Sequence, residues 1–105
     1  MLNIIMTLNY LRSLLQNKGV KLFLSKPYGL EFLYILDKCN RESIDNGIDD
    51  TFDLIFFNKP RKEAFHKFVD LLASKGHLLK LKSEIKASKT VLRMSKDVQE
   101  ALDAQ

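Results

Sequence analysis

The chain has 105 residues, enough for one domain with one small hydrophobic core. Apolar residues make up 46% and charged residues 29%, which is ordinary for a globular protein, and no apolar run approaches the roughly 20 residues that span a bilayer. The composition therefore argues against a membrane protein. The formal net charge is +4, which favours an anionic partner. The single cysteine, Cys39, leaves no internal disulfide to form and predicts a cytoplasmic protein.

The N-terminal part of the chain predicts an amphipathic helix over about residues 5–17. Its leucines recur at helical spacing, and Asn17 to Gly19 supplies a stop signal. Residues 20–24 are short and apolar, and we expect a strand or an extended link there. Ser25 can then cap a second helix, whose first turn tolerates the proline that follows. This helix is apolar nearly all round, which is typical of a central helix in a small fold.

The middle of the chain predicts a loop and two further helices. Residues 40–50 are polar and acidic and form the loop. A short helix over residues 51–57 follows, with an aspartate as its cap. A longer helix starts near Pro60, runs to about Ser74 and is ended by Gly76. The side chains expected to be buried on these two helices are Phe52, Ile55, Phe56, Phe65, Phe68, Val69 and Leu72.

The C-terminal part predicts a β-hairpin and a last helix. Residues 79–82 alternate strictly between leucine and lysine, which is typical of a half-buried strand. Residues 90–94 form the second strand, and residues 85–89 form a basic tip between the two. Ser95 can cap a terminal helix over about residues 96–104. The fold class predicted from these elements is a single domain, mainly α, with a small β-hairpin.

Two similar stretches leave a different fold open. Residues 22–27 and 55–60 both run from apolar residues into a lysine–proline helix start. A duplicated strand–helix unit would make residues 20–24 and 53–57 paired strands of an α+β domain. Such a domain would bind RNA or play a structural role.

Charge is strongly polarised along the chain. Residues 59–94 hold ten lysines and arginines against three acids, so this segment is net +7. Residues 37–53 hold six acids against two bases and are net −4. A basic helix and hairpin beside an acidic segment is the pattern of an oriented surface for a polyanion. The alternative is that these cations are only the solvated faces of a helix and a hairpin.

The order of elements and two stretches of sequence resemble prokaryotic, especially archaeal, winged helix-turn-helix transcription regulators. Residues 24–33 (LSKPYGLEFL) look like the first core helix of these proteins. Residues 65–81 (FHKFVDLLASKGHLLKL) look like the second half of their recognition helix running into the wing. The resemblance covers about residues 24–104. The chain departs from the family pattern in its long acidic link, in the bulky phenylalanines of the short helix and in its lysine-bearing wing tip.

The resemblance implies a transcriptional regulator that binds double-stranded DNA sequence-specifically. The basic helix would lie in the major groove and the hairpin on the flanking backbone. Arg61 is the best candidate for reading guanine, because its planar guanidinium matches the O6/N7 edge, and the lysines would hold phosphates. The predicted DNA contacts are Lys59, Arg61, Lys62, His66, Lys67, Lys82, Lys86 and Lys89.

Helix-turn-helix proteins usually bind DNA as twofold dimers. The surplus apolar residues of this chain lie at its two ends, so we predict a homodimer through the N-terminal helix, with the C-terminal helix as a second contact region. The predicted dimer residues are Ile4, Ile5, Leu8, Leu11 and Leu15. The alternative is that these helices only close the core of the monomer.

No pattern of residues predicts an enzyme, a cofactor, a metal site or a small-molecule ligand. His66, His77 and Cys39 lack the spacing of metal ligands, and the four glycines are too dispersed for a phosphate loop. Cys39 is expected to be a buried small hydrophobe rather than a thiol sensor. The alternative function is a protein-interaction module of the same fold that does not contact DNA.

Overall fold

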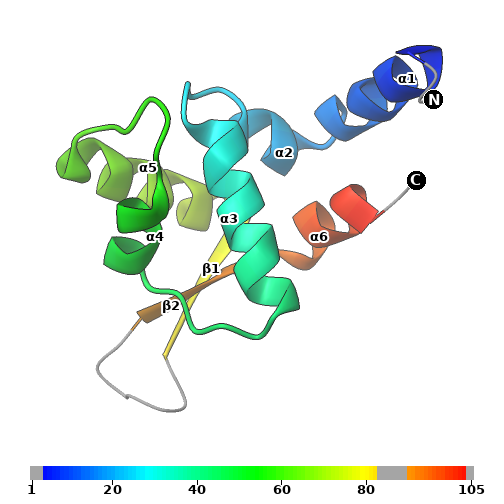
Figure 1. The fold of residues 1–105 in the computed structure, drawn as a ribbon. Coiled ribbons are helices and arrows are strands. Elements are labelled where there is room, and N and C mark those ends of the chain that lie inside the picture. Colours follow the sequence, from blue (N-terminus) through cyan, green and yellow to red (C-terminus); the bar gives the residue numbers. More distant parts are fainter. Residues whose placement is uncertain (1–3, 83–89, 104–105) are drawn as a thin grey trace.

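The computed structural model describes residues 4–82 and 90–103, with side chains from residue 8 onward. This part of the chain forms helices and one two-stranded antiparallel sheet (Figure 1). The elements in order are α1 (Ile4–Leu15), α2 (Lys18–Phe23), α3 (Gly29–Arg41), α4 (Ile48–Leu54), α5 (Lys62–Ser74), β1 (Leu78–Lys82), β2 (Thr90–Met94) and α6 (Lys96–Asp103). The predicted class, mainly α with a small β-hairpin, is confirmed.

Both strands of the hairpin contact helices, but they are buried to different extents. β1 and β2 pair with Leu78 opposite Met94 and Lys82 opposite Thr90. Most of β2 is buried because α3 and α4 lie against it, whereas only the first residue of β1 is buried. The alternating pattern predicts that the leucine side of β1 is buried. Leu79 and Leu81 are instead 44% and 47% exposed, so this prediction is wrong.

A cluster of aromatic rings joins α2, α3 and α5 at the centre of the molecule. Phe23, Phe32 and Phe65, one from each of these helices, are fully buried. The ring centroids of Phe32 and Phe65 are 4.9 Å apart and those of Phe23 and Phe32 are 5.3 Å apart. Tilted and edge-to-face pairs of this kind contribute about 0.5–1.5 kcal/mol each beyond the burial of their surface. The buried face predicted for α5 is confirmed by Phe65, Phe68, Val69 and Leu72.

Residues 20–23 lie in helix α2. The prediction of a strand or an extended link over residues 20–24 is therefore wrong. The side-chain oxygen of Asn17 accepts a hydrogen bond from the backbone N–H of Val20 at 3.0 Å and caps the helix. Val20 and Phe23 lie one turn apart and are both fully buried. Since α2 and α4 are helices, neither residues 20–24 nor residues 53–57 form a strand, and the duplicated strand–helix fold is wrong as well.

The starts of α3 and α4 differ from those predicted. Helix α3 begins at Gly29, because the hydroxyl of Ser25 donates to the carbonyl of Leu22 at 2.6 Å and closes α2 instead of capping α3. Helix α4 begins three residues earlier than predicted. Gly47 occupies its N-cap position, and the carboxylate of Asp50 accepts the backbone N–H of Gly47 at 3.4 Å.

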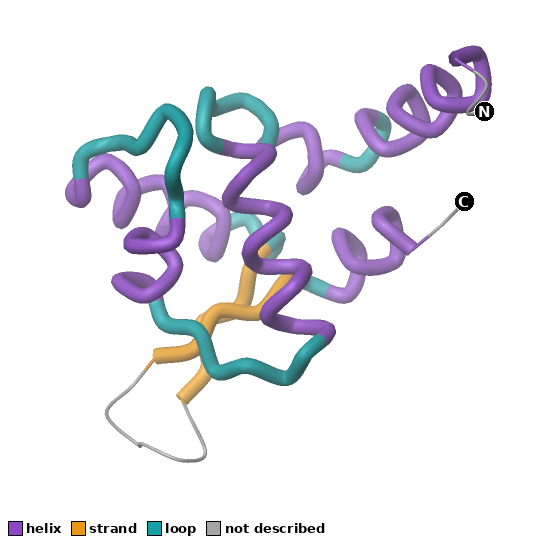
Figure 2. The backbone as a smooth tube through the Cα atoms, in the orientation of Figure 1, coloured by secondary structure: helices purple, strands orange, loops and turns teal. Residues whose placement is uncertain are grey.

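Helix α1 extends away from the body of the molecule, with α2 and α6 as its main neighbours (Figures 1 and 2). The hydroxyl of Tyr10 donates to the carbonyl of Leu102 at 3.1 Å and ties α1 to α6. Ser95 caps α6 as predicted, since its hydroxyl oxygen accepts the backbone N–H of Val98 at 3.3 Å. Among the described helices, none combines the length and the apolar character that crossing a bilayer requires.

Candidate nucleic-acid interface

The N-terminal half of α5 presents basic side chains opposite its buried face. The helix begins at Lys62, two residues after the predicted start, and Arg61 occupies the N-cap position in extended backbone. Arg61, Lys62 and Lys67 are exposed, while Phe65 and Phe68 of the same helix face the core. This amphipathic arrangement directs the basic residues of the helix into solvent.

Asp49, near the start of α4, contacts two of the predicted DNA-binding residues. Its Oδ1 lies 3.0 Å from Nε2 of His66 and 3.5 Å from Nζ of Lys62. The hydrogen bond with His66, followed by the charge of Lys62, holds the pKa of the Asp49 carboxyl below its ordinary value. The sequence indicates Asp49 only as a candidate helix cap. Its contact with α5 could not be predicted, because it depends on how α4 and α5 pack. The basic surface therefore includes a carboxylate that the sequence did not place there.

The other predicted DNA contacts differ in whether a neighbouring side chain engages their charge. The ammonium of Lys59 lies over the ring of Phe52, 4.5 Å from its centroid. Within the described ranges, no ion pair engages Arg61 or Lys67. Lys82 ends β1 with an exposed side chain, and Lys86 and Lys89 lie outside the described residues.

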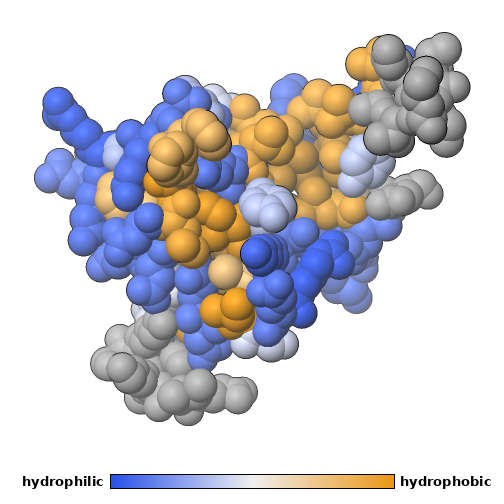
Figure 3. Space-filling model, in the orientation of Figure 1, coloured by the Kyte–Doolittle hydropathy of each residue, from blue (hydrophilic) through white to orange (hydrophobic). Residues whose placement is uncertain are grey.

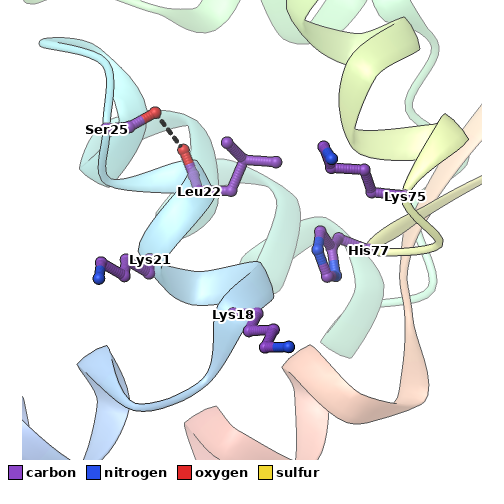
Figure 4. Close-up of a pocket in the computed structure, with 6 residues that line it drawn as sticks. All are labelled: Lys18, Lys21, Leu22, Ser25, Lys75 and His77. Atoms are coloured by element: carbon purple, nitrogen blue, oxygen red, sulfur yellow. Dashed lines mark hydrogen bonds between the residues drawn. The ribbon is translucent and has the colours of Figure 1, made fainter.

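A second group of cations lines a pocket at the other end of α5 (Figure 4). The pocket holds about 610 Å³ and was not predicted, because its walls come from segments more than 45 residues apart in the chain. Gly76 adopts φ +77° and makes the turn that ends α5, as predicted. The lining residues are Lys18, Lys21, Leu22, Ser25, Lys75 and His77.

Apolar side chains gather on a third surface, over α3 and the α4–α5 loop (Figure 3). We call Leu30, Tyr34, Phe56 and Phe57 the aromatic patch; they are 69%, 63%, 79% and 67% exposed. The carboxylate of Glu31 accepts hydrogen bonds from the backbone N–H groups of Phe56 and Phe57 at 3.0 and 2.8 Å. These bonds fix the loop that follows α4. The prediction that Phe56 is buried is therefore wrong.

The predicted dimer residues lie along the projecting helix α1. Leu8, Leu11 and Leu15 are 54%, 45% and 46% exposed, whereas Leu14 faces the core. The side chains of Ile4 and Ile5 lie outside the described ones, although their backbone belongs to α1. The exposed leucines are compatible with a contact to a second copy, and Leu14 provides the contact to the monomer's own core.

The remaining candidate groups are Cys39 and the side chains that could bind a metal ion. Cys39 is buried, as predicted, and burial, followed by the charge of Glu42, raises the pKa of its thiol. In the part of the chain that the structure describes, no three histidine, cysteine or carboxylate side chains are grouped to hold a metal ion. That the protein has no metal site and is not an enzyme stays a prediction.

The chain matches no protein-family model, and no match was found among curated proteins or among solved structures. Its function is therefore argued from the residues and their geometry.

Proposed function

We propose that this protein binds double-stranded DNA as a winged helix-turn-helix transcriptional regulator. The observation that carries the proposal is the exposed basic face on the N-terminal half of α5, opposite a fully buried face. The order of a helix, a short helix, a basic helix and a hairpin (α3, α4, α5, β1–β2) supports it. In such proteins the N-terminal residues of the recognition helix approach the base edges.

The proposal assigns different roles to the cations. Arg61 at the N-cap of α5 would read a base edge, because its guanidinium can donate two parallel hydrogen bonds to guanine. Lys67 and Lys82 would bind phosphates, as would the lysines of the hairpin tip. With these four phosphate contacts, the logarithm of the binding constant should fall with the logarithm of the salt concentration with a slope of about −3.6.

The test is fluorescence anisotropy with a random-sequence duplex at about 50 and 200 mM salt. Wild type should bind and lose about 150-fold in affinity between the two salt concentrations. The variant Arg61→Gln/Lys67→Gln should bind more weakly, with a slope smaller in magnitude by about 1, because Lys67 is the member of this pair that is assigned to a phosphate. The control Lys38→Gln/Lys96→Gln removes two exposed charges from α3 and α6 and should behave as wild type. If folded wild type does not bind even at low salt, the proposal is wrong.

A homodimer through α1 belongs to the same proposal. Three exposed leucines on a helix that projects from the body form an apolar surface that a second copy can cover. Because such a contact is self-complementary, it would relate two copies of α5 by a twofold axis. This is the arrangement in which helix-turn-helix proteins read paired half-sites.

The aromatic patch favours a second candidate function, a protein-interaction module. Its three aromatic side chains are at least 63% exposed, and aromatic residues dominate the energetics of protein interfaces. A cleft of about 360 Å³ adjoins the patch between α3 and α4, with Tyr34 and Leu54 in its lining. Glu31 and Glu42 also line it, against one lysine. The partner that fits is a segment with apolar anchors flanked by lysine or arginine.

Selection from a random peptide display library tests this candidate function. The selected peptides should combine apolar anchors with basic residues, and they should not bind the variant Tyr34→Ala/Phe57→Ala. The control Leu79→Ala/Leu81→Ala, which truncates two exposed leucines of β1, should retain them. Peptides that bind both variants equally, or that lack basic residues, would contradict the assignment.

A further inference from the structure

Close packing fixes the position of α2 and His77 beside the pocket at the C-terminal end of α5. A Cβ atom at Gly19 would clash with the side chain of Val98 and lie 3.0 Å from Nδ1 of His77, so glycine lets α2 approach both residues. The backbone of His77 is held on two sides. Its N–H donates to the carbonyl of Leu72 at 2.9 Å, and its carbonyl accepts the N–H of Ser95 at 3.1 Å.

The charge of this pocket is of one sign. Three lysines and His77 line it, and no described carboxylate does. Several other described cations meet acids: Lys62 meets Asp49, and Arg93 meets Asp45. Ammonium groups that share a concave surface repel one another, and a bound anion removes that repulsion.

The donors of the pocket come from two separate segments, residues 18–25 and 75–77 (Figure 4). In this view Lys75 extends toward Leu22, Lys18 lies beneath His77, and Lys21 extends away from Lys75 and His77. Ser25 already donates its hydroxyl hydrogen to the carbonyl of Leu22 at 2.6 Å, so its oxygen offers no further donor. The ammonium groups of Lys18 and Lys75 are therefore the main positive donors, with His77 and Lys21 also in the lining, and Leu22 adds an apolar wall.

We propose that this pocket binds a small organic anion of the phosphate ester class, with at least two negative charges. The lysines would bind the phosphate oxygens as point charges, and the organic part would contact Leu22. Lys75 lies 14 residues after Arg61, so roughly 20 Å of helix separates the pocket from the residues proposed to read DNA. The pocket is thus a separate site, and the proposal does not depend on DNA binding.

Isothermal titration calorimetry of the full chain with sodium pyrophosphate, at constant ionic strength, tests the site. Wild type should bind one pyrophosphate, and Lys18→Gln/Lys75→Gln should weaken binding at least about tenfold, because each substitution removes a charge-assisted hydrogen bond. The control Lys38→Gln/Lys96→Gln removes two charges near the end of one helix and at the start of another, and it should bind as wild type. Circular dichroism establishes that all variants are folded.

Three outcomes would overturn the proposal. If folded wild type shows neither heat nor a shift in Tm with millimolar pyrophosphate, the pocket does not bind phosphates. If both double variants weaken binding equally, the effect comes from net charge. The third outcome concerns the source of the phosphate. If pyrophosphate displaces a DNA duplex and Lys18→Gln/Lys75→Gln abolishes duplex binding, the pocket is a contact for the DNA backbone rather than for a small molecule.

Discussion

At the scale of single residues, the Asp49 carboxylate lowers the positive potential of the surface proposed to meet DNA. It lies within 3.5 Å of Lys62 and hydrogen-bonds His66. The Asp49 side chain is 61% exposed, and exposed ion pairs contribute little to folding stability. The consequence of this contact is therefore expected in binding rather than in stability.

Replacing Asp49 with asparagine should tighten binding of a random-sequence duplex severalfold at low salt, because Lys62 becomes available to a phosphate. The salt slope should steepen by about 1, which corresponds to one added phosphate contact. Anisotropy titrations at several salt concentrations measure both quantities. Asp53→Asn on the same helix removes the same charge at another exposed position and serves as control. Equal gains in the two variants would mean that net charge alone matters.

Arg41 at the end of α3 contacts two carboxylates, one on α3 itself and one at the end of α6. Its Nε donates to Asp37 at 2.8 Å, and its Nη2 donates to Asp103. The hydrogen bond from Arg41 lowers the pKa of Asp103, with a smaller effect from Gln99. A carboxyl whose pKa is lower in the folded chain than in the unfolded one stabilises the fold above the unfolded pKa of about 4. That stabilisation is lost as the pH falls through the folded pKa.

The variant Asp103→Asn should therefore melt at a lower temperature than wild type near neutral pH. The difference in Tm should stay constant down to about pH 5 and shrink toward zero as the pH falls through the lowered pKa of Asp103. Thermal melts followed by circular dichroism over a pH series measure it. A difference that persists at the acid end would show that the Asp103 side chain acts through packing instead of charge.

At the scale of elements, the sequence predicted those helices and strands that carry strong periodicity and clear end signals. The left-handed Gly76 and the Ser95 cap are local signals, and both were found where expected. Helix α2 has six residues, and a run so short does not distinguish a helix from a strand. The end of α4 depends on Glu31, which binds backbone groups 25 and 26 residues away. Such contacts cannot be read from local patterns.

The candidate site likewise combines features that local sequence patterns predict with features that depend on packing. The basic character of α5 follows from composition, so Arg61 and Lys67 were predicted as exposed cations and are exposed. The contact of Asp49 with His66 depends on the packing of α4 against α5. The pocket between α2 and α5 required α2 to be a helix and Gly19 to lie against His77. Neither was visible from charge or periodicity.

The turn from α2 into α3 depends on a close approach at Gly29. A Cβ atom there would clash with the backbone carbonyl of Phe23, which cannot move without shifting the fully buried Phe23 ring. Gly29→Ala should therefore destabilise the protein by about 2 kcal/mol or more, as measured by urea unfolding. Gly76→Asn should cost much less, because asparagine tolerates a positive φ and the space around Gly76 is open. Similar losses in the two variants would contradict this explanation.

At the scale of the whole molecule, the shape is that of a body with an arm. The Cα atoms span 46 × 27 × 27 Å, and α1 forms the arm. Phe23 anchors α2 in the aromatic cluster, and Tyr10 ties α1 to α6. The arm is thus attached to the body through α2 and α6 while the leucines on its other side remain exposed. A second copy that covers these leucines would bring the α5 helices of both copies into one dimer.

The variant Leu8→Lys/Leu11→Lys should convert the proposed dimer to a monomer, because two charges would then lie in an apolar contact. Sedimentation velocity at tens of micromolar protein measures the change in mass, and a random-sequence duplex should still bind each chain through α5. Leu79→Lys/Leu81→Lys is a matched control, since these leucines are 44% and 47% exposed and those of α1 are 54% and 45%. It should remain dimeric. A monomeric wild type, or a control that dissociates as readily, would show that α1 serves only the monomer.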